Sequence, residues 1–426
     1  MSGSAAVWRS RLAPQAKIWW AVALVLAGLT VGYYVRLWPR VNNKDFRVYV
    51  EGGAALARGG DIYADIDAFK AAFSGGTYSE SDANFRWPYA YPPLSAILAV
   101  PLAALPYEPV ALAWTVANVA MLALAGWLCL RAQGPVEPLD LALLGAALYA
   151  FYPAVVTVRL GQIEILQFLL LAGTFLAVKR GHNDLAGVLL GLATALKLFP
   201  GALVAFLLWK RLWRPAIAAM VTGGVLLLGS FAVVGLNQIP RYLAFTSVYT
   251  HGFAGFSFNQ SLHGFFVRNL TVNIFTPSLR GWHLPWLAEG LTIGISALLV
   301  GAWAWLTWRP LAPDRLATSA RFDLEFAGTI VLMLLVLPHS QVYAFVWLLL
   351  PFLVLAYQLW RRGPAWAWLP VLVAYALVGR HYLLFVPGLT RLVAAHIMFG
   401  ALLLLAVTGG LLWYARGAPA LAGGDD

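Results

Sequence analysis

Charged residues are scarce in this sequence, and cysteine is almost absent. Only 11% of its 426 residues are Asp, Glu, Lys or Arg, whereas soluble domains carry roughly a quarter. Together with a mean hydropathy of +0.75, this composition excludes a soluble globular protein. The single cysteine, Cys129, lies in an apolar run. An intramolecular disulfide is therefore excluded, and a cysteine metal site has no support.

Several catalytic signatures are missing as well. The sequence has no H-E-x-x-H, C-x-x-C, G-x-S-x-G or Walker motif, so metal chelation, serine hydrolysis and nucleotide hydrolysis have no support. The acidic run DIYADID could bind a divalent ion through Asp61, Asp65 and Asp67, but hydrated surface carboxylates are the simpler interpretation. We expect no metal and no cofactor. The net charge of +11 is scattered in ones and twos rather than gathered in a stripe, so nucleic acid is not an expected partner.

Apolar segments of membrane length are abundant. Segments of about 20 apolar residues can cross a bilayer as helices, and basic residues keep to the cytoplasmic side. The first segment, residues 18–38, follows Arg9, Arg11 and Lys17. It is too long for a signal peptide and no cleavage site follows it, so we interpret it as a retained anchor directed outward. We predict an all-α polytopic protein of the cell (plasma) membrane, with about 10–12 transmembrane helices and both termini cytoplasmic.

The chain is expected to form a single integral-membrane domain, residues 1–426. Lys197 and Pro200 interrupt one apolar interval, and proline removes a helix hydrogen bond, so two half-length helices should turn inside the membrane there. Residues 93–106 are apolar but short, which favours a re-entrant or interfacial helix. The predicted order is a first span at 18–38, a large extracytoplasmic catalytic loop with interfacial helices at 39–92, membrane helices at 93–236 with the broken pair at 184–209, a second extracytoplasmic region at 237–283, membrane helices at 284–414, and a cytoplasmic tail at 415–426.

The first polar loop carries seven of the chain's 18 carboxylates, beginning with Asp45. Apolar and small residues recur after Asp45 at helical spacing, which predicts a short helix on the membrane surface with Asp45 and Tyr49 on one face. Asp45 could be a catalytic base, or it could simply cap this helix, because Asp is a favoured N-cap. Val48 provides no capping box, and Asn42 or Asn43 could cap instead. The seven carboxylates are Asp45, Glu51, Asp61, Asp65, Asp67, Glu80 and Asp82.

Ionisable residues beside or inside membrane segments mark further candidate sites, because they are costly there unless they have a function. Arg159, Gln162 and Glu164 lie where one span ends and the next begins. They could contact a phosphate and hydroxyls, or Arg159 and Glu164 could pair to stabilise the turn. Lys197 has little room to snorkel, so it should have an anionic partner, either a ligand or a structural carboxylate.

Two later clusters are predicted to face the same side as the acidic loop. One is FNQSLHGFFVR, whose donors and acceptors suit a sugar or a phosphate. The other consists of two short outward turns, one with His339 and one with Arg380 and His381. A lone interfacial His is more often structural, but two His and one Arg facing the acidic loop favour a bound anion. The polar residues of the first cluster are Asn259, Gln260, Ser261, His263 and Arg268.

Five segments in one order resemble glycosyltransferase family 87, a family of GT-C membrane mannosyltransferases that includes the mycobacterial enzyme elongating phosphatidylinositol mannosides. The resemblance extends from Asp45 to Tyr343, and each segment alone is weakly specific. The segments are DFRVYVEGGAALARGGDIY, YAYPPLSAILAVPLAALP, GQIEILQFLLLAGTFLAVKRG, LAGVLLGLATALKLFP and NQSLHGF.

The resemblance implies a GT-C-type fold and an inverting transfer of a sugar, usually mannose, from a polyprenyl-phosphate donor. It implies a catalytic Asp in the first extracytoplasmic loop, which matches Asp45, and a His near the outer end of a late span, which matches His339. Two departures are visible: Glu164 stands where the family commonly has Asn, and His339 is single where a pair is common. The expected partners are the donor, a glycolipid or lipid-linked acceptor, and membrane lipids.

These expectations combine into one mechanism, with Asp45 accepting the proton of an acceptor hydroxyl and cations stabilising the leaving phosphate. The alternative function is a transporter or flippase of a lipid-linked sugar, since broken helices are typical of transporters. No oligomeric state is indicated. For the donor phosphate we expect His339, Arg380, Lys197 and Arg268. For the sugar or acceptor we expect Tyr49, Arg159, Gln162, Glu164, Asn259, Gln260, His263 and His381.

Overall fold

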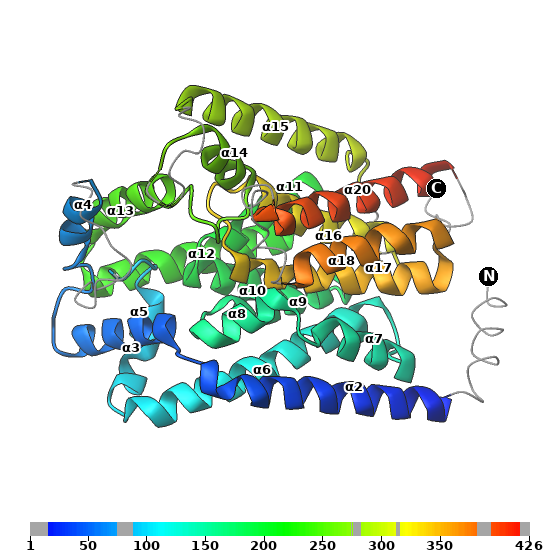
Figure 1. Ribbon diagram of the computed structural model, residues 1–426, viewed down its shortest axis with the longest axis horizontal. Coiled ribbons are helices and arrows are strands. Elements are labelled where there is room, and N and C mark those ends of the chain that lie inside the picture. The colour runs from blue at the N-terminus through cyan, green and yellow to red at the C-terminus, as the bar shows by residue number, and fades with distance from the viewer. Residues whose placement is uncertain are drawn as a thin grey trace.

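The protein is a bundle of helices that run side by side along its longest axis (Figure 1). The computed structural model describes residues 16–74, 88–273, 275, 283–311, 316–380 and 393–417. In this part of the chain six helices are long and apolar enough to cross a membrane. The prediction of an all-α polytopic membrane protein is therefore confirmed. The six are α2 with η2 (Ala16–Arg40), α6 (Tyr107–Gln133), α12 (Trp213–Val234), α15 (Pro285–Leu306), η5 with the body of α17 (Val342–Arg361) and most of α20 (His396–Gly417).

One apolar segment of the region 93–236, where membrane helices are predicted, is bent. The apolar residues 139–158 do not form one straight helix but two, α7 (Pro138–Leu148) and α8 (Tyr152–Leu160), bent by 64°. Pro153 occupies the first turn of α8, where its missing N–H costs nothing, whereas it could not continue α7. The remaining helices of the bundle are shorter: α9 (Glu164–Lys179), α16 (Ala320–Val336), and η6 with α18 (Ala365–Gly379).

The chain breaks at Lys197. Here α10 (Asn183–Leu196) ends in an extended residue, Lys197, with φ −160° and ψ 127°, before η3 (Phe199–Gly201) and α11 (Ala202–Trp209). Helix α10 packs closely on α12, because a Cβ at Gly191 would lie only 2.8 Å from the carbonyl oxygen of Ala219. Close packing of α10 on α12 thus fixes the position of the Lys197 break within the bundle.

Short helices gather at one end of the bundle, at the left of Figure 1. They are α3 (Lys44–Ala57), α4 (Ile66–Ser74), α5 (Leu94–Ala103) and α13 (Gln238–Gly252), while α14 (Leu262–Leu270) packs against α15. Arg241 on α13 pairs at 2.6 Å with Asp61 and with Asp67, which fastens α4 and the residues before it to α13. Two carboxylates of the acidic run DIYADID therefore form ion pairs within the protein.

Buried ion pairs hold the opposite end of the bundle. Lys179, the last residue of α9, pairs at 2.5 Å with Asp323 on α16, and Lys210 pairs at 2.8 Å with Glu325. Removing one partner of such a pair leaves an uncompensated buried charge. These contacts fix α9, whose first residue is Glu164, and thereby help to place the polar groups at the α3 end.

Candidate functional site

A cavity of about 340 Å³ lies at the α3 end of the bundle. Its walls come from the first turn of α3, the turn between α8 and α9, the segment before α5, helix α13 and the start of η5. The lining combines polar groups with aromatic rings. Asp45, Gln162, Tyr91, Tyr249, Gln341 and Tyr343 supply polar groups, and Phe245, Phe253, Phe256 and Phe258 form the apolar wall.

The side-chain amide of Gln162 forms hydrogen bonds with Asp45 and with two tyrosines. Gln162 donates from Nε2 to Asp45 Oδ2 at 2.8 Å and to the Tyr91 hydroxyl at 3.2 Å, while the Tyr49 hydroxyl donates to Gln162 Oε1 at 2.9 Å. Tyr49 lies one helical turn after Asp45 on the same face of α3. Asp45 and Tyr49 therefore share one face of α3, as predicted, and both side chains form hydrogen bonds with Gln162. The geometry gives Gln162 the role of orienting the Asp45 carboxylate.

The start of α3 is fixed by neighbouring helices. Asn43, the N-cap residue, has a left-handed backbone (φ 47°) and donates from its side chain to Thr115 at 3.2 Å on α6. The backbone N–H groups of Asn42 and Asn43 both donate to the carbonyl of Arg159 at 3.1 Å. Asp45 lies inside the first turn rather than at the cap. Its carboxylate is thus directed to the cavity and does not cap the helix.

Burial raises the pKa of Asp45 to about 6, and its hydrogen bond from Gln162 opposes that rise. Nearby charges act in both directions, since Lys44 and Lys197 favour the carboxylate and Glu164 disfavours it. A carboxyl group with this pKa is ionised at neutral pH yet is a stronger base than a solvated Asp. Such tuning suits a general base.

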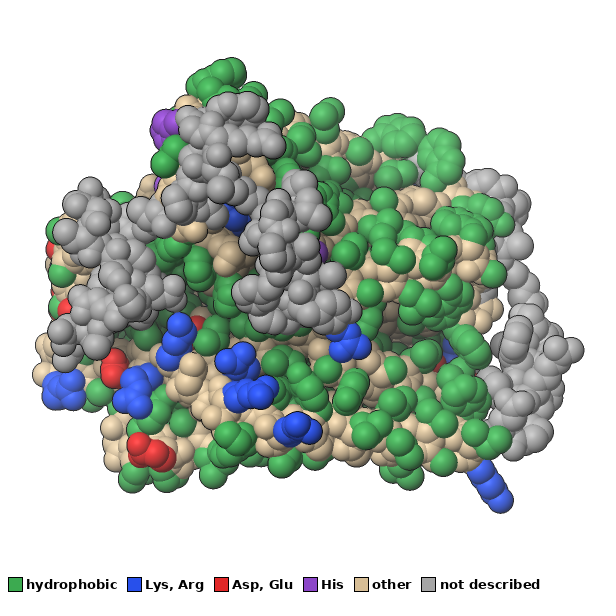
Figure 2. All heavy atoms as spheres, in the orientation of Figure 1, with side chains coloured by type: hydrophobic (Ala, Val, Ile, Leu, Met, Phe, Trp, Pro, Cys, Tyr) green, Lys and Arg blue, Asp and Glu red, His purple; other side chains and the backbone are tan. Residues whose placement is uncertain are grey.

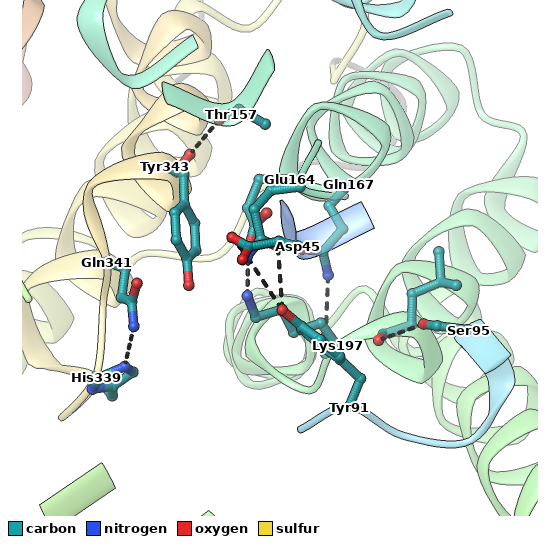
Figure 3. Close-up of polar contacts among 12 residues, drawn as sticks. Asp45, Tyr91, Ser95, Thr157, Glu164, Gln167, Lys197, His339, Gln341 and Tyr343 are labelled. Carbon is teal, nitrogen blue, oxygen red and sulfur yellow. Dashed lines mark hydrogen bonds and ion pairs between the residues drawn. The ribbon is translucent and has the colours of Figure 1, made fainter. Parts of the chain in front are cut away.

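Lys197 pairs with Glu164 next to Asp45 (Figure 3). The Lys197 ammonium also lies 5.0 Å from the Tyr343 ring and 5.5 Å from the Tyr91 ring. Glu164 is fully buried, and within the described residues its Oε2 has no hydrogen-bond partner. The partner of Glu164 is Lys197 and not Arg159, because the exposed Arg159 side chain donates instead to the carbonyl of Arg40 at 3.4 Å.

His339 lies on the other side of the Tyr343 ring from Lys197 and Asp45, next to Gln341 (Figure 3). Gln341 donates from Nε2 to His339 Nε2 at 2.7 Å, and the His339 ring packs edge-on against Tyr249 at 4.9 Å. Burial, aided by the charge of Lys197, lowers the pKa of His339 to about 3. The ring is therefore neutral at pH 7. Because Nε2 accepts, Nδ1 carries the proton, and in the described part of the chain Nδ1 has no partner.

Arg268 lies behind the aromatic wall of the cavity. It is fully buried, and it donates to the backbone carbonyls of Phe256 at 3.0 Å and Asn259 at 2.5 Å. Burial lowers the pKa of Arg268 to about 10. The guanidinium group therefore stabilises the backbone between Phe256 and Asn259. The predicted contact of Arg268 with a phosphate stays a prediction.

The other polar residues of the FNQSLHGFFVR segment support the turn that carries His339. Asn259 donates to the carbonyl of Pro338 at 3.1 Å and forms an isolated β-bridge with Gln341. Gln260 donates at 2.7 Å to the carbonyl of Ala394. His263 contacts Glu289 at 2.9 Å and the Pro338 carbonyl at 3.3 Å. These contacts favour structural roles, and the predicted contacts with a sugar stay predictions.

Two predicted residues remain, Arg380 and His381, and Arg380 does not line the cavity. Arg380 is the half-exposed C-cap residue of α18, and His381 falls outside the described residues. Conversely, Tyr91, Tyr249 and Tyr343 line the cavity although they were not among the predicted site residues. Tyr91 belongs to the YAYPP segment and could have been found there, whereas no spacing in the sequence points to Tyr249. Among the described residues no cluster of His, Cys, Asp and Glu could hold a metal ion.

An apolar groove of about 420 Å³ adjoins the site on the other side of α3. The Phe46 ring, next to Asp45 in the chain, stacks on Trp114 of α6 with 5.0 Å between centroids and forms part of the groove. The rest of the lining is apolar and comes from α6 and the end of α5, including Leu102, Leu105 and Val110. The first turn of α3 thus separates a polar cavity from a surface suited to a lipid chain.

Known proteins resemble this chain over most of its length. A model of glycosyltransferase family 87 matches residues 89–338. A polyprenol-phosphate-mannose-dependent alpha-(1-2)-phosphatidylinositol pentamannoside mannosyltransferase of Mycolicibacterium smegmatis is 32% identical over 355 residues, which cover 80% of this chain and 74% of the relative. A polyprenol-phosphate-mannose-dependent alpha-(1-2)-phosphatidylinositol mannoside mannosyltransferase of Mycobacterium tuberculosis is 27% identical over 367 residues, covering 81% and 78% of the two chains.

Proposed function

The chain belongs to glycosyltransferase family 87, and from this premise we propose that it transfers mannose from a polyprenyl-phosphate donor to a hydroxyl of a phosphatidylinositol mannoside-like glycolipid. The donor and the acceptor class are those in the names of its relatives. The observation that carries the proposal is Asp45, a carboxylate on the wall of the cavity, oriented by Gln162 and with its pKa raised to about 6.

Asp45 acts as the general base in a single displacement. The acceptor oxygen attacks the anomeric carbon of a β-linked mannosyl phosphate, the bond from that carbon to the phosphate oxygen breaks, and the acceptor proton moves to Asp45. Inversion then gives an α-linked product and a polyprenyl phosphate monoester. One catalytic carboxylate suffices, in contrast to the two carboxylates of retaining glycosidases.

Lys197 and His339 are the residues we assign to the donor phosphate. The leaving phosphate needs electrostatic stabilisation more than a proton. Lys197 brings a positive charge that Glu164 balances in the absence of donor, and His339 brings an unpartnered Nδ1–H donor. The apolar groove beside Phe46 would take a lipid chain.

We place the cavity on the extracytoplasmic side, with both termini in the cytoplasm. The support for this orientation is the basic Arg9, Arg11 and Lys17 before the first span, since basic residues stay inside. A polyprenyl chain and a glycolipid acceptor would both reach the α3 end from the outer leaflet.

Transfer of labelled mannose in reconstituted membranes tests the assignment of Asp45. Asp45→Asn should lower the transfer rate by about 10²- to 10⁴-fold, the usual contribution of a general base. The matched control is Asp65→Asn, which removes an exposed carboxylate from the same loop and should transfer at the normal rate. A wild-type rate for Asp45→Asn would refute the catalytic role. Movement of the donor across the membrane without transfer would instead support a transporter.

A further inference from the structure

Three arginines from distant parts of the chain surround Tyr33 near the end of α2. Arg40 ends η2, Arg159 lies in the last turn of α8, and Arg380 follows α18. All three interact electrostatically with the hydroxyl of Tyr33 on α2, and Arg159 donates from Nε to the carbonyl of Arg40 at 3.4 Å. We call these three residues the arginine cluster.

The arginine cluster has no acidic partner within the described residues, where none of the three guanidinium groups forms an ion pair. Other arginines of the chain do pair, as Arg241 does with Asp61 and Asp67. Figure 2 shows Lys and Arg side chains gathered over the adjoining ends of α2, α3 and α8. In the proposed orientation this end is extracytoplasmic, where basic residues oppose the usual bias. Their position there calls for an anionic partner.

Aromatic residues place the cluster at the level of lipid headgroups. Tyr33 packs against Tyr149 of the α7–α8 break with 5.5 Å between ring centroids, and Trp38 stands 42% exposed just before Arg40. Below them α2 exposes apolar side chains such as Val35. Trp and Tyr mark the membrane–water interface, and guanidinium groups bind phosphate oxygens in a bidentate manner. In the proposed orientation the cluster would therefore lie at the level of phospholipid phosphodiesters.

The cluster is connected directly to the rim of the cavity. The carbonyl of Arg159 accepts hydrogen bonds from the N–H groups of Asn42 and Asn43, and the next residues along the two chain segments, Lys44 and Leu160, line the cavity. A lipid whose phosphate rests on the arginines would thus present its headgroup at the mouth of the cavity.

We propose that Arg40, Arg159 and Arg380 bind the phosphodiester of an anionic glycolipid acceptor and so position its sugar headgroup toward Asp45. This inference rests on the proposed function. The cluster would act as a specificity determinant, because a neutral glycolipid with the same sugar lacks the group that the arginines bind.

The experiment compares two acceptors in phosphatidylcholine nanodiscs, a phosphatidylinositol mannoside and a neutral mannosyl diacylglycerol. We expect wild-type protein to show a KM about tenfold lower for the anionic acceptor, because a charge-assisted contact is worth about 1.5 kcal/mol or more. The triple variant Arg40→Gln, Arg159→Gln, Arg380→Gln should bring the ratio of the two KM values close to one. The triple Arg→Lys variant keeps the charges and should restore part of the preference. Arg58→Gln, an exposed arginine at the far end of α3, is the matched control and should keep the wild-type ratio.

A second measurement separates this inference from the proposed function. Binding of the phosphatidylinositol mannoside to Asp45→Asn protein, followed by native mass spectrometry, requires no transfer and should weaken about tenfold when the three arginines are replaced. Unchanged binding, or an equal rise of KM for both acceptors, would overturn the assignment. Displacement of the lipid by submillimolar inorganic phosphate would overturn it as well, because the site would then recognise phosphate and not the lipid. Absence of transfer to either acceptor, with binding still dependent on the arginines, would count against the proposed function alone.

Discussion

Asp45 is the residue on which the proposed chemistry depends, and its protonation should be visible in the pH profile. Burial favours the protonated carboxyl and raises the pKa to about 6, so the base is lost as the pH falls through that value. We expect kcat/KM to be level above about pH 7 and about tenfold lower near pH 5, since one pH unit below the pKa leaves about a tenth of the group ionised. Transfer assays from pH 4.5 to 8.5 measure this. A profile that stays flat to pH 4.5 would contradict it.

Gln162 is expected to act through Asp45 as a positioning residue. Its hydrogen bond favours the ionised carboxylate, so Gln162→Leu should raise the pKa of Asp45 and move the acid limb of kcat/KM to higher pH. Loss of orientation should also reduce kcat by about tenfold. Gln162→Glu, which adds a second carboxylate beside Asp45, should move the limb further in the same direction. If both variants change only stability and leave the limb in place, Gln162 has a structural role alone.

Packing of α3 on α5 is the contact between helices that we expect to matter most for the position of Asp45. A Cβ at Gly53 would lie 2.7 Å from the carbonyl carbon of Ala99 and 2.8 Å from the backbone nitrogen of Val100, and backbone atoms cannot rotate away. Gly53→Ala should therefore push α3 outward, lower the free energy of unfolding by about 1–3 kcal/mol and reduce transfer. Thermal unfolding in detergent and the transfer rate measure the two effects.

A glycine with open space around it supplies the control. A Cβ added at Gly28 on α2 would meet no atom within 4 Å, so Gly28→Ala should leave transfer unchanged and keep or slightly raise stability, because alanine is the better helix former. Equal behaviour of Gly53→Ala and Gly28→Ala would show that the α3–α5 contact tolerates expansion.

The molecule as a whole is expected to cross the membrane with the cavity outside. Its single cysteine, Cys129, is fully buried, so an impermeant maleimide should not label the native protein. Arg58→Cys, at the end of α3, should be labelled on intact cells. His182→Cys, in the turn after α9, lies a full helix length from Glu164 and should be labelled only after permeabilisation. The reverse pattern would place the catalytic end in the cytoplasm.

Local properties of the chain are sufficient to predict its class and to single out candidate site residues. Apolar length determines which segments can cross a bilayer, and this predicted the all-α membrane fold. Isolated polar groups beside such segments stand out for the same reason, which is how Asp45, Lys197 and His339 became candidates, and the family resemblance pointed to Asp45 and His339 as well. The bend between α7 and α8 was missed, because the apolar character of residues 139–158 continues through the break.

The sequence by itself determined that this chain is a helical membrane protein, which carboxylate is the best candidate for a base, and the family to which it belongs. Only the tertiary structure decided the partners of each polar group: Gln162 reaches Asp45 across 117 residues of chain, and Glu164 pairs with Lys197 and not with Arg159. The physical reason is that hydrophobic length and helical spacing are read along the chain. A buried polar side chain instead takes whichever partner helix packing brings within hydrogen-bond distance.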